Sequence, residues 1–164
     1  SRALREGAQS RADFIVGRYR RVAPLFTRIV DPLDPGLRLS LITSGNLKRA
    51  TRRLPCHQAT IGHLSSLRHL GGYDTHFRVL ADQELLIRAT AAGMVMRKSS
   101  VVFCNYQTGG LSSDVTTSQQ EMEEILLRRG CAPESVQAAL RQVGWSGLVR
   151  WIERLGQRPT SAQS

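Results

Sequence analysis

The sequence has no long hydrophobic run and little cysteine or histidine. Its longest uncharged apolar stretches, such as Met94–Met96 and Val101–Cys104, are far shorter than the roughly 20 residues of a membrane-spanning helix. The cysteines form no C-x-x-C pair, which favours a reducing, cytoplasmic compartment over a disulfide scaffold; they are Cys56, Cys104 and Cys131. The histidines stand six, six and seven residues apart, a spacing that does not predict a zinc site; they are His57, His63, His69 and His76.

Lysine and aromatic residues are also scarce, while arginine is abundant. Only two of the 23 basic residues are lysine, the net charge is +10, and aromatic residues make up 5%. Such an excess suits nucleic acid, an anionic membrane face or phosphorylated small molecules, or it reflects a coding bias toward arginine. A nucleic-acid-binding module predicts clustered basic residues with exposed aromatics between them. The only real concentrations are Arg18–Arg21 and Lys48–Arg53, which argues against that module.

The pattern along the chain predicts an α/β protein of about one domain, and we expect it to be part of a longer protein. Strands are predicted over residues 12–19 and 22–30, and one or two further strands within 94–107. A turn is predicted at 31–36, and a loop with one short helix over 37–54. Helices are predicted over residues 59–70, 81–92, 118–129, 133–143 and 148–155. This order predicts a mostly parallel sheet in an α/β part over 1–113, a helical appendage over 114–156 and a frayed tail over 157–164.

Four motifs lie in one order between Pro55 and Ser112. They are Pro55-Cys56-His57-Gln58, the turn Gly71-Gly72-Tyr73-Asp74, the helix start Ala81-Asp82-Gln83-Glu84-Leu85 with Arg88, and Gly109-Gly110-Leu111-Ser112. In this order and at these intervals they resemble the acceptor-side half of family 2 glycosyltransferases of the GT-A fold. The resemblance implies a partial GT-A (Rossmann-like) sheet and an enzyme that moves a sugar from a nucleotide-sugar donor to a glycan or lipid-linked acceptor, with inversion.

The resemblance also implies roles for individual residues. Asp82 stands at the position of the general base, which takes the proton of the acceptor hydroxyl. The expected substrate-binding residues are His57, Gln58, Asp74, Arg78, Gly109 and Gly110. The family holds its donor diphosphate through a divalent metal, Mg²⁺ or Mn²⁺, on a D-x-D motif. No D-x-D occurs in these residues, so we expect the chain alone to be inactive, with the donor-binding half supplied elsewhere.

Each candidate also has a purely structural interpretation. Asp82 can be a helix N-cap or an acid of the first helical turn, and Glu84 an ion-pair partner of Arg88. His57 and Gln58 can be a polar pair that ends a strand, and Asp74 a turn acid. Arg78 and Arg88 can be solvated surface residues, and Gly109-Gly110 a plain loop.

Two further readings of the whole chain stay open beside the enzyme. One is a basic nucleic-acid-binding module and the other is a non-catalytic remnant of a glycosyltransferase. The enzyme hypothesis places the protein in the cytoplasm, with peripheral contact at the inner face of the membrane as an option. We also expect the helical tail to pack on the α/β part through Met122, Ile125, Leu126, Leu148 and Ile152.

Overall fold

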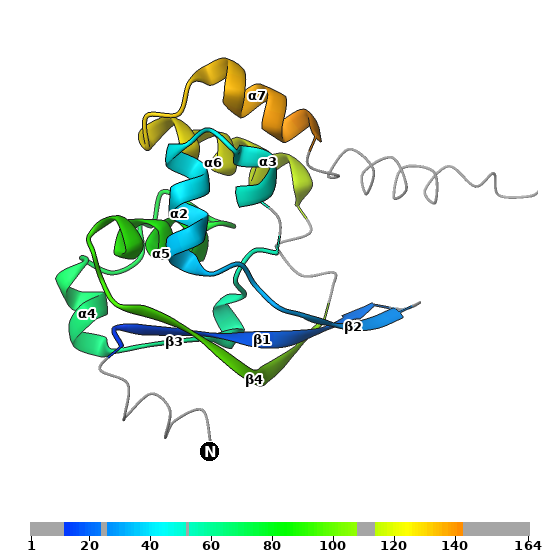
Figure 1. The fold of residues 1–164 in the computed structure, drawn as a ribbon, viewed down its shortest axis with the longest axis vertical. Helices are drawn as coiled ribbons and strands as arrows, with labels where there is room; N and C mark the ends of the chain where they lie inside the picture. The colour runs from blue at the N-terminus through cyan, green and yellow to red at the C-terminus, as the bar shows by residue number, and fades with distance from the viewer. Residues whose placement is uncertain (1–11, 24–25, 52, 108–113, 143–164) are drawn as a thin grey trace, which may run out of the picture.

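The structure places helices on one side of an open four-stranded sheet (Figure 1). It is a computed structural model and describes residues 12–23, 26–51, 53–107 and 114–142. The class is therefore mixed α/β, as the sequence predicts. No helix in these ranges is long and apolar enough to cross a bilayer.

Strand β1 (Phe14–Ala23) is the centre of the sheet. Strand β4 (Met96–Gln107) runs parallel to it along one edge. On the other edge β2 (Phe26–Val30) pairs antiparallel with its C-terminal half, and β3 (Thr60–Gly62) pairs antiparallel with its first three residues. The C-terminal half of β1 therefore lies between β2 and β4.

The expectation of a mostly parallel sheet is wrong, because two of the three strand pairings are antiparallel. Only two residues separate β1 from β2, and so short a connection can join only antiparallel neighbours. A parallel pair needs a crossover of a dozen residues or more. The segments that lead to β3 and to β4 are both that long, and of these two strands β4 is the one that lies parallel to β1.

The helices differ from the sequence-based expectation mainly in the first half of the chain. Residues 37–54 hold two helices instead of one, and the helix expected from residue 59 begins only at Leu64, after a 3₁₀ turn and β3. The helices expected near residues 81–92, 118–129 and 133–143 are confirmed, whereas residues 148–155 lie outside the described ranges. The elements are α2 (Pro35–Thr43), α3 (Leu47–Ala50), η1 (His57–Ala59), α4 (Leu64–His69), α5 (Ala81–Ala91), α6 (Val115–Arg128) and α7 (Pro133–Gln142).

Asp31 and Asp34, which the sequence places in a turn, have separate structural roles. Asp34 is the N-cap of α2, where its carboxylate accepts a hydrogen bond of 3.0 Å from the backbone N–H of Leu37. Pro35 follows at the first helical position, where its missing N–H costs nothing. Asp31 forms ion pairs of 3.1 Å with Arg18 and Lys98, which tie the end of β2 to β1 and β4.

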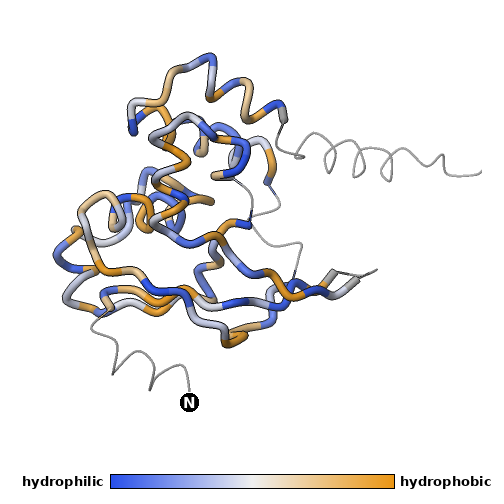
Figure 2. Tube along the Cα trace, viewed as in Figure 1, coloured by the Kyte–Doolittle hydropathy of each residue, from blue (hydrophilic) through white to orange (hydrophobic). Residues whose placement is uncertain are grey.

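Most of the hydrophobic core lies among the helices. Helices α2, α3, α5, α6 and α7 share one cluster, whose most deeply buried side chains include Ile42, Leu47, Met122, Ile125, Leu126 and Val136. The expected packing through Met122, Ile125 and Leu126 is therefore confirmed, whereas Leu148 and Ile152 lie outside the described residues. Figure 2 shows hydrophobic residues recurring along both the strands and these helices.

A second, smaller cluster holds α5 against the sheet. Phe14 of β1 packs with Leu86 and Ala89 of α5, and all three are buried. The ring of Phe14 lies over Gly62 of β3, so that a Cβ atom on Gly62 would meet it at 2.6 Å. The packing that fixes α5 on the sheet therefore depends on a residue without a side chain.

We expect Gly62→Ala to destabilise the fold by about 1–3 kcal/mol, the usual cost of overpacking a core. The ring of Phe14 is only 3% exposed, so it cannot swing away into solvent. Urea unfolding measures the change, and a cycle with Phe14→Leu provides the control, because the smaller side chain makes room for the new methyl group. An equal cost of Gly62→Ala in both backgrounds would show that the clash is not its cause.

Candidate active site

A cavity of about 550 Å³ opens beside the C-terminal half of β1. This volume lies within the range of small-molecule sites. Its walls come from β1, β2, the end of β4, residues 53–58, the segment that leads into α5, and the start of α6. The cavity therefore joins the sheet to the first turn of α5, where two of the sequence motifs meet.

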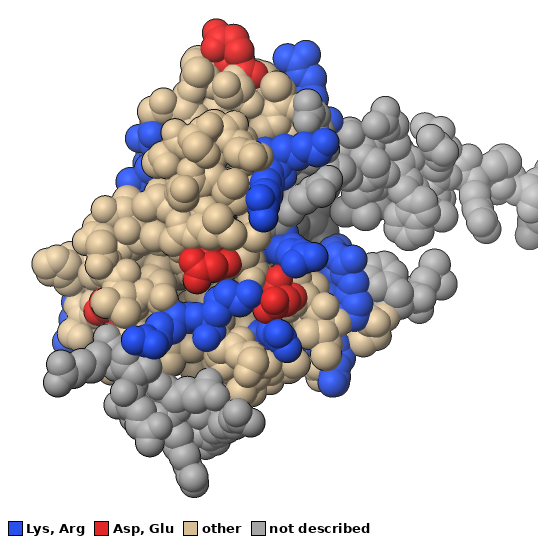
Figure 3. All heavy atoms as spheres, in the orientation of Figure 1, with Lys and Arg blue, Asp and Glu red and all other residues tan. Residues whose placement is uncertain are grey.

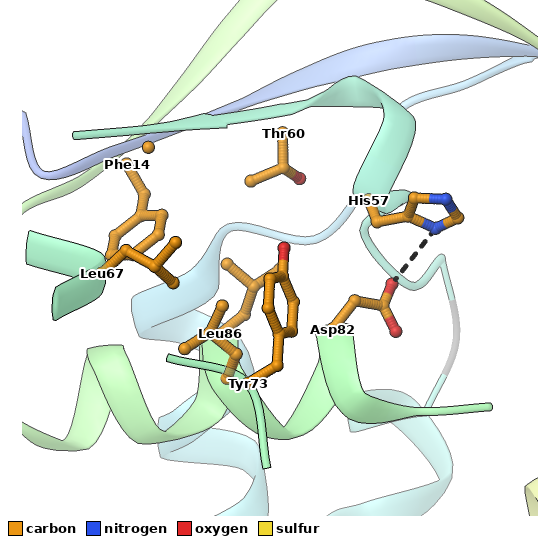
Figure 4. Close-up of a pocket in the computed structure, with 9 residues that line it drawn as sticks. Phe14, His57, Thr60, Leu67, Tyr73, Asp82 and Leu86 are labelled. Carbon is orange, nitrogen blue, oxygen red and sulfur yellow. Dashed lines mark ion pairs between the residues drawn. The ribbon is translucent and has the colours of Figure 1, made fainter. Parts of the chain in front are cut away.

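Asp82 and His57 both line this cavity, and Figure 4 shows their side chains facing each other where they also line the smaller cavity next to it. Asp82 is the second residue of α5, and its side chain is 17% exposed. Its Oδ2 atom lies 3.8 Å from Nδ1 of His57, whose side chain is 59% exposed. Both residues also line a neighbouring cavity of about 80 Å³ that includes Phe14 and Tyr73. A carboxylate and an imidazole thus meet at the boundary between two cavities.

The interpretation of Asp82 as a helix N-cap is wrong. The N-cap of α5 is Leu80, whose own side chain makes no capping hydrogen bond, whereas Asp82 lies in the first turn. An acid in the first turn is still favoured by the positive end of the helix dipole. From the first turn of α5, the side chain of Asp82 reaches the lining of the cavity.

Two buried residues behind Asp82 hold its carboxylate. Nε2 of Gln83 donates to Oδ2 of Asp82 at 2.9 Å and to the carbonyl of Pro55 at 2.7 Å. Oε1 of Gln83 accepts from Nη1 of Arg38 at 2.9 Å, and Nε of Arg38 donates to the carbonyl of Ala50 at 3.3 Å. Gln83 and Arg38 are each 3% exposed. Both the oxygen and the nitrogen of the Gln83 side-chain amide are thus hydrogen-bonded, and this fixes the orientation of Asp82.

Burial raises the pKa of Asp82 above its ordinary value of 3.8. The hydrogen bond from Gln83 and the charges of His57 and Arg38 oppose this shift only in part. Burial also lowers the pKa of Arg38, to about 10, so this guanidinium is a cation at neutral pH. A carboxylate with a raised pKa is a stronger proton acceptor once it is ionised.

The raised pKa has a consequence for stability that Asp82→Asn tests. Below the unfolded-state pKa the side chain is neutral and carries no cost, and stability falls as pH rises through the higher folded-state value. We therefore expect Asp82→Asn to be more stable than the wild type at pH 7, by a margin that shrinks as the pH falls. Urea unfolding of both proteins from pH 7 downward measures that margin. A less stable Asp82→Asn at pH 7 would contradict the raised pKa.

Of the other expected site residues, Gln58 and Arg78 line the same cavity as Asp82 and His57. Asp74 is not among the described residues that line it. Its carboxylate accepts the backbone N–H of His76 at 3.0 Å and pairs with Arg128 at 3.1 Å, so the turn-acid interpretation is the one that these contacts support. The hydrogen bond from His76 is the main cause that lowers the pKa of Asp74. Gly109 and Gly110 lie outside the described residues.

Arg88 and Glu84 hold the turn that precedes the site. They form the expected ion pair within α5, at 2.8 Å, and Arg129, the C-cap of α6, approaches Glu84 at 3.4 Å. The guanidinium of Arg88 also donates to the backbone carbonyls of Leu70 and Gly72 at the end of α4. Arg88 is therefore engaged in structure and is not a phosphate ligand.

Glu121 of α6 is a site residue that sequence reasoning missed. Its buried carboxylate accepts the backbone N–H groups of Arg78, Val79 and Leu80, with shortest distances of 2.7, 3.0 and 2.7 Å. These residues lead directly into α5, so Glu121 fixes the point where α5 begins. No local sequence signal marks it, because its partners lie more than 40 residues away.

The residues around the cavity do not offer a site for the divalent metal that the resemblance implies. Within the described ranges, no group of three or more His, Cys, Asp or Glu side chains is placed to hold a metal ion. Asp82 is the single carboxylate among the described residues that line the cavity. The carboxylate of Asp82 and the imidazole of His57 can transfer protons and form hydrogen bonds.

Comparisons of the chain with protein-family models, with curated proteins and with solved structures found no match. The four motifs and the geometry of Asp82, His57 and the residues behind them are therefore the features that bear on function.

Proposed function

We propose that this chain is the acceptor-side catalytic part of a glycosyltransferase, with Asp82 as the general base. The observation that carries the proposal is the position of Asp82. A carboxylate from one of the four motifs lies in the first turn of α5, faces a ligand-sized cavity, and meets His57 of another motif. Its raised pKa and its buried support by Gln83 suit a proton acceptor.

The proposed reaction is a single displacement with inversion. The acceptor hydroxyl gives its proton to the Asp82 carboxylate while its oxygen forms a bond to the anomeric carbon of the donor sugar. The bond from that carbon to the nucleoside diphosphate breaks, and the diphosphate leaves with the electron pair. Gln83 keeps the carboxylate oriented through its hydrogen bond to Oδ2. The imidazole of His57, which is exposed beside the Asp82 carboxylate, would form a hydrogen bond with an acceptor hydroxyl.

The donor side of the reaction lies outside this chain in the proposal. The donor diphosphate and its divalent metal are assigned to a donor-binding half with a D-x-D motif, which these residues lack. A bound metal would neutralise the leaving diphosphate. The residues described here would bind the acceptor, orient it and remove its proton.

The test is an assay for release of nucleoside diphosphate from a panel of nucleotide sugars. The full-length protein that contains this chain should release it with an acceptor present, whereas the 164-residue chain alone should not. Asp82→Asn in the full-length protein serves as the catalytic control. Steady release by the 164-residue chain alone would overturn the division into two halves, and no release by the full-length protein from any donor would overturn the proposed function.

A further inference from the structure

We infer that the cavity beside β1 contains a diphosphate-binding site formed by Arg21, Arg28, Arg53 and Arg78. All four line the cavity, and Asp82 is the single described carboxylate in its walls. Four guanidinium groups around one cavity provide many donors with the planar geometry that phosphate oxygens match. The site is an addition to the proton-transfer residues described above.

No acid of the described residues holds these four arginines in a close ion pair, although the charge of Arg78 interacts with that of Asp114. Within the described part of the chain, none of them forms an ion pair, whereas Arg18, Arg88, Arg128 and Arg129 all do. Nε of Arg21 is buried and has no hydrogen-bond partner among the residues that the structure describes. A buried donor without a partner is costly, and an anionic ligand in the cavity would remove that cost.

The pairing of β1 with β2 brings two of the arginines together. Arg21 lies directly opposite Arg28 in the antiparallel register, and opposite residues point to the same face with their Cβ atoms about 5 Å apart. Two like charges in that arrangement destabilise a sheet. An anion between the two side chains converts this repulsion into attraction, so the arrangement favours a ligand with at least two negative charges.

Arg53 adds a third positive charge to the cavity, and its backbone conformation is strained. Its φ of +50° lies in the left-handed region, which a residue with a long side chain rarely adopts. Its carbonyl accepts the N–H of Leu33 at 3.0 Å, which anchors the conformation. The strained conformation thus occurs at an arginine that lines the cavity.

The rest of the cavity suits an ester of the diphosphate. Tyr19 and Tyr106 lie edge to face with their ring centroids 6.0 Å apart, and both line the cavity. Figure 3 shows Lys and Arg side chains gathered on the side of the molecule where β2 lies. The diphosphate therefore belongs at the arginines, with its organic part toward the tyrosines and Asp82. That the ester is a substrate of sugar transfer rests on the proposed function, whereas the anion site itself does not.

The test is calorimetric titration of the 164-residue chain with inorganic pyrophosphate at low salt, with EDTA present. Wild type should bind pyrophosphate, and Arg28→Gln should bind it about tenfold more weakly, the effect of losing one charged hydrogen bond. Arg97→Gln is the matched control, because it removes one positive charge from an exposed position of β4 outside the cavity. No binding by wild type, or an equal loss in Arg97→Gln, would overturn the site.

A second variant separates binding from folding. Arg53→Gly relieves the left-handed backbone, so its melting temperature should not fall below that of the wild type by more than Arg97→Gln lowers it. Its affinity for pyrophosphate should still drop about tenfold. Unchanged affinity in Arg53→Gly would show that Arg53 does not bind the anion and that the four arginines do not form the site together. Asp82→Asn should bind pyrophosphate at least as tightly as wild type, because it removes a negative charge from the cavity.

Two esters then identify the source of the diphosphate. Uridine diphosphate represents the nucleotide of a donor, and farnesyl diphosphate represents a lipid-linked acceptor. Farnesyl diphosphate should bind more tightly than pyrophosphate and lose about tenfold in Arg28→Gln, because the proposed function assigns the donor to another part of the enzyme. Tighter binding of uridine diphosphate would overturn that assignment of the donor and keep the anion site. If neither ester binds more tightly than pyrophosphate, the assignment of a diphosphate ester is wrong. Pyrophosphate binding together with a full-length protein that transfers no sugar would overturn the proposed function and leave the site standing.

Discussion

Asp82→Asn should lower the turnover of the full-length enzyme by about 100- to 10,000-fold, the usual contribution of a general base. The amide cannot accept the proton of the acceptor hydroxyl, although it can still accept the hydrogen bond that Gln83 donates to Asp82. Because the donor diphosphate is assigned to another part of the enzyme, the KM for the donor should barely change. Steady-state kinetics with varied donor and acceptor separates the two effects.

The matched control is Asp114→Asn. Asp114 is the N-cap of α6, where its carboxylate accepts the backbone N–H of Thr117 at 3.0 Å, and asparagine caps a helix about as well as aspartate. This variant carries the same chemical change at a helix start away from the cavity lining, so turnover should be retained. If Asp82→Asn keeps more than about a tenth of wild-type turnover, Asp82 is not the base.

Helices with a clear apolar period could be predicted from the sequence, and the sheet order could not. The helices near residues 81–92, 118–129 and 133–143 show the spacing that a buried face requires. Strand pairing, by contrast, depends on contacts between distant segments. The three residues of β3 are too few to show an alternating pattern, and their place beside β1 follows from the packing of Phe14 over Gly62.

Helix α2 shows why residues 37–54 gave no clean period. It buries Arg38, a residue that sequence reasoning assigns to solvent. The burial is possible because the guanidinium donates to Ala50 and Gln83, and these partners lie 12 and 45 residues away. A polar residue inside the core therefore interrupts the apolar stripe of α2. No nearby sequence pattern predicts the hydrogen-bond partners of Arg38.

The residues of the candidate site also fall into two groups, those that could be identified from the sequence and those that could not. Asp82 and His57 stand in motifs and could be singled out from the sequence, as could Gln58 and Arg78. The residues that support or surround them could not, because their roles exist only through tertiary contacts. Gln83 joins Arg38 to Asp82, and the opposition of Arg21 to Arg28 follows from the register of a hairpin.

Glu121 is the supporting residue whose loss should cost most. We expect Glu121→Ala to lower the free energy of unfolding by about 3 kcal/mol, because it leaves the backbone N–H groups of Arg78, Val79 and Leu80 without their acceptor. Each buried donor left unpaired costs about 1–3 kcal/mol, less where water can reach it. The start of α5 should loosen at the same time, so amide hydrogen exchange at Val79 and Leu80 should speed up.

The control for this experiment is Glu124→Ala on the same helix. Glu124 pairs with His76 at 2.9 Å and with Arg128 at 2.6 Å, but these ion pairs lie on the surface, where such pairs contribute little. Its loss should be clearly smaller than that of Glu121→Ala, and exchange at Val79 and Leu80 should stay slow. Because Asp82 lies two residues after Leu80, Glu121→Ala should also reduce turnover of the full-length enzyme at temperatures where it remains folded. Equal effects of the two substitutions on stability and on exchange would mean that Glu121 does not anchor the start of α5, and that Asp82 is positioned by Gln83 and the core alone.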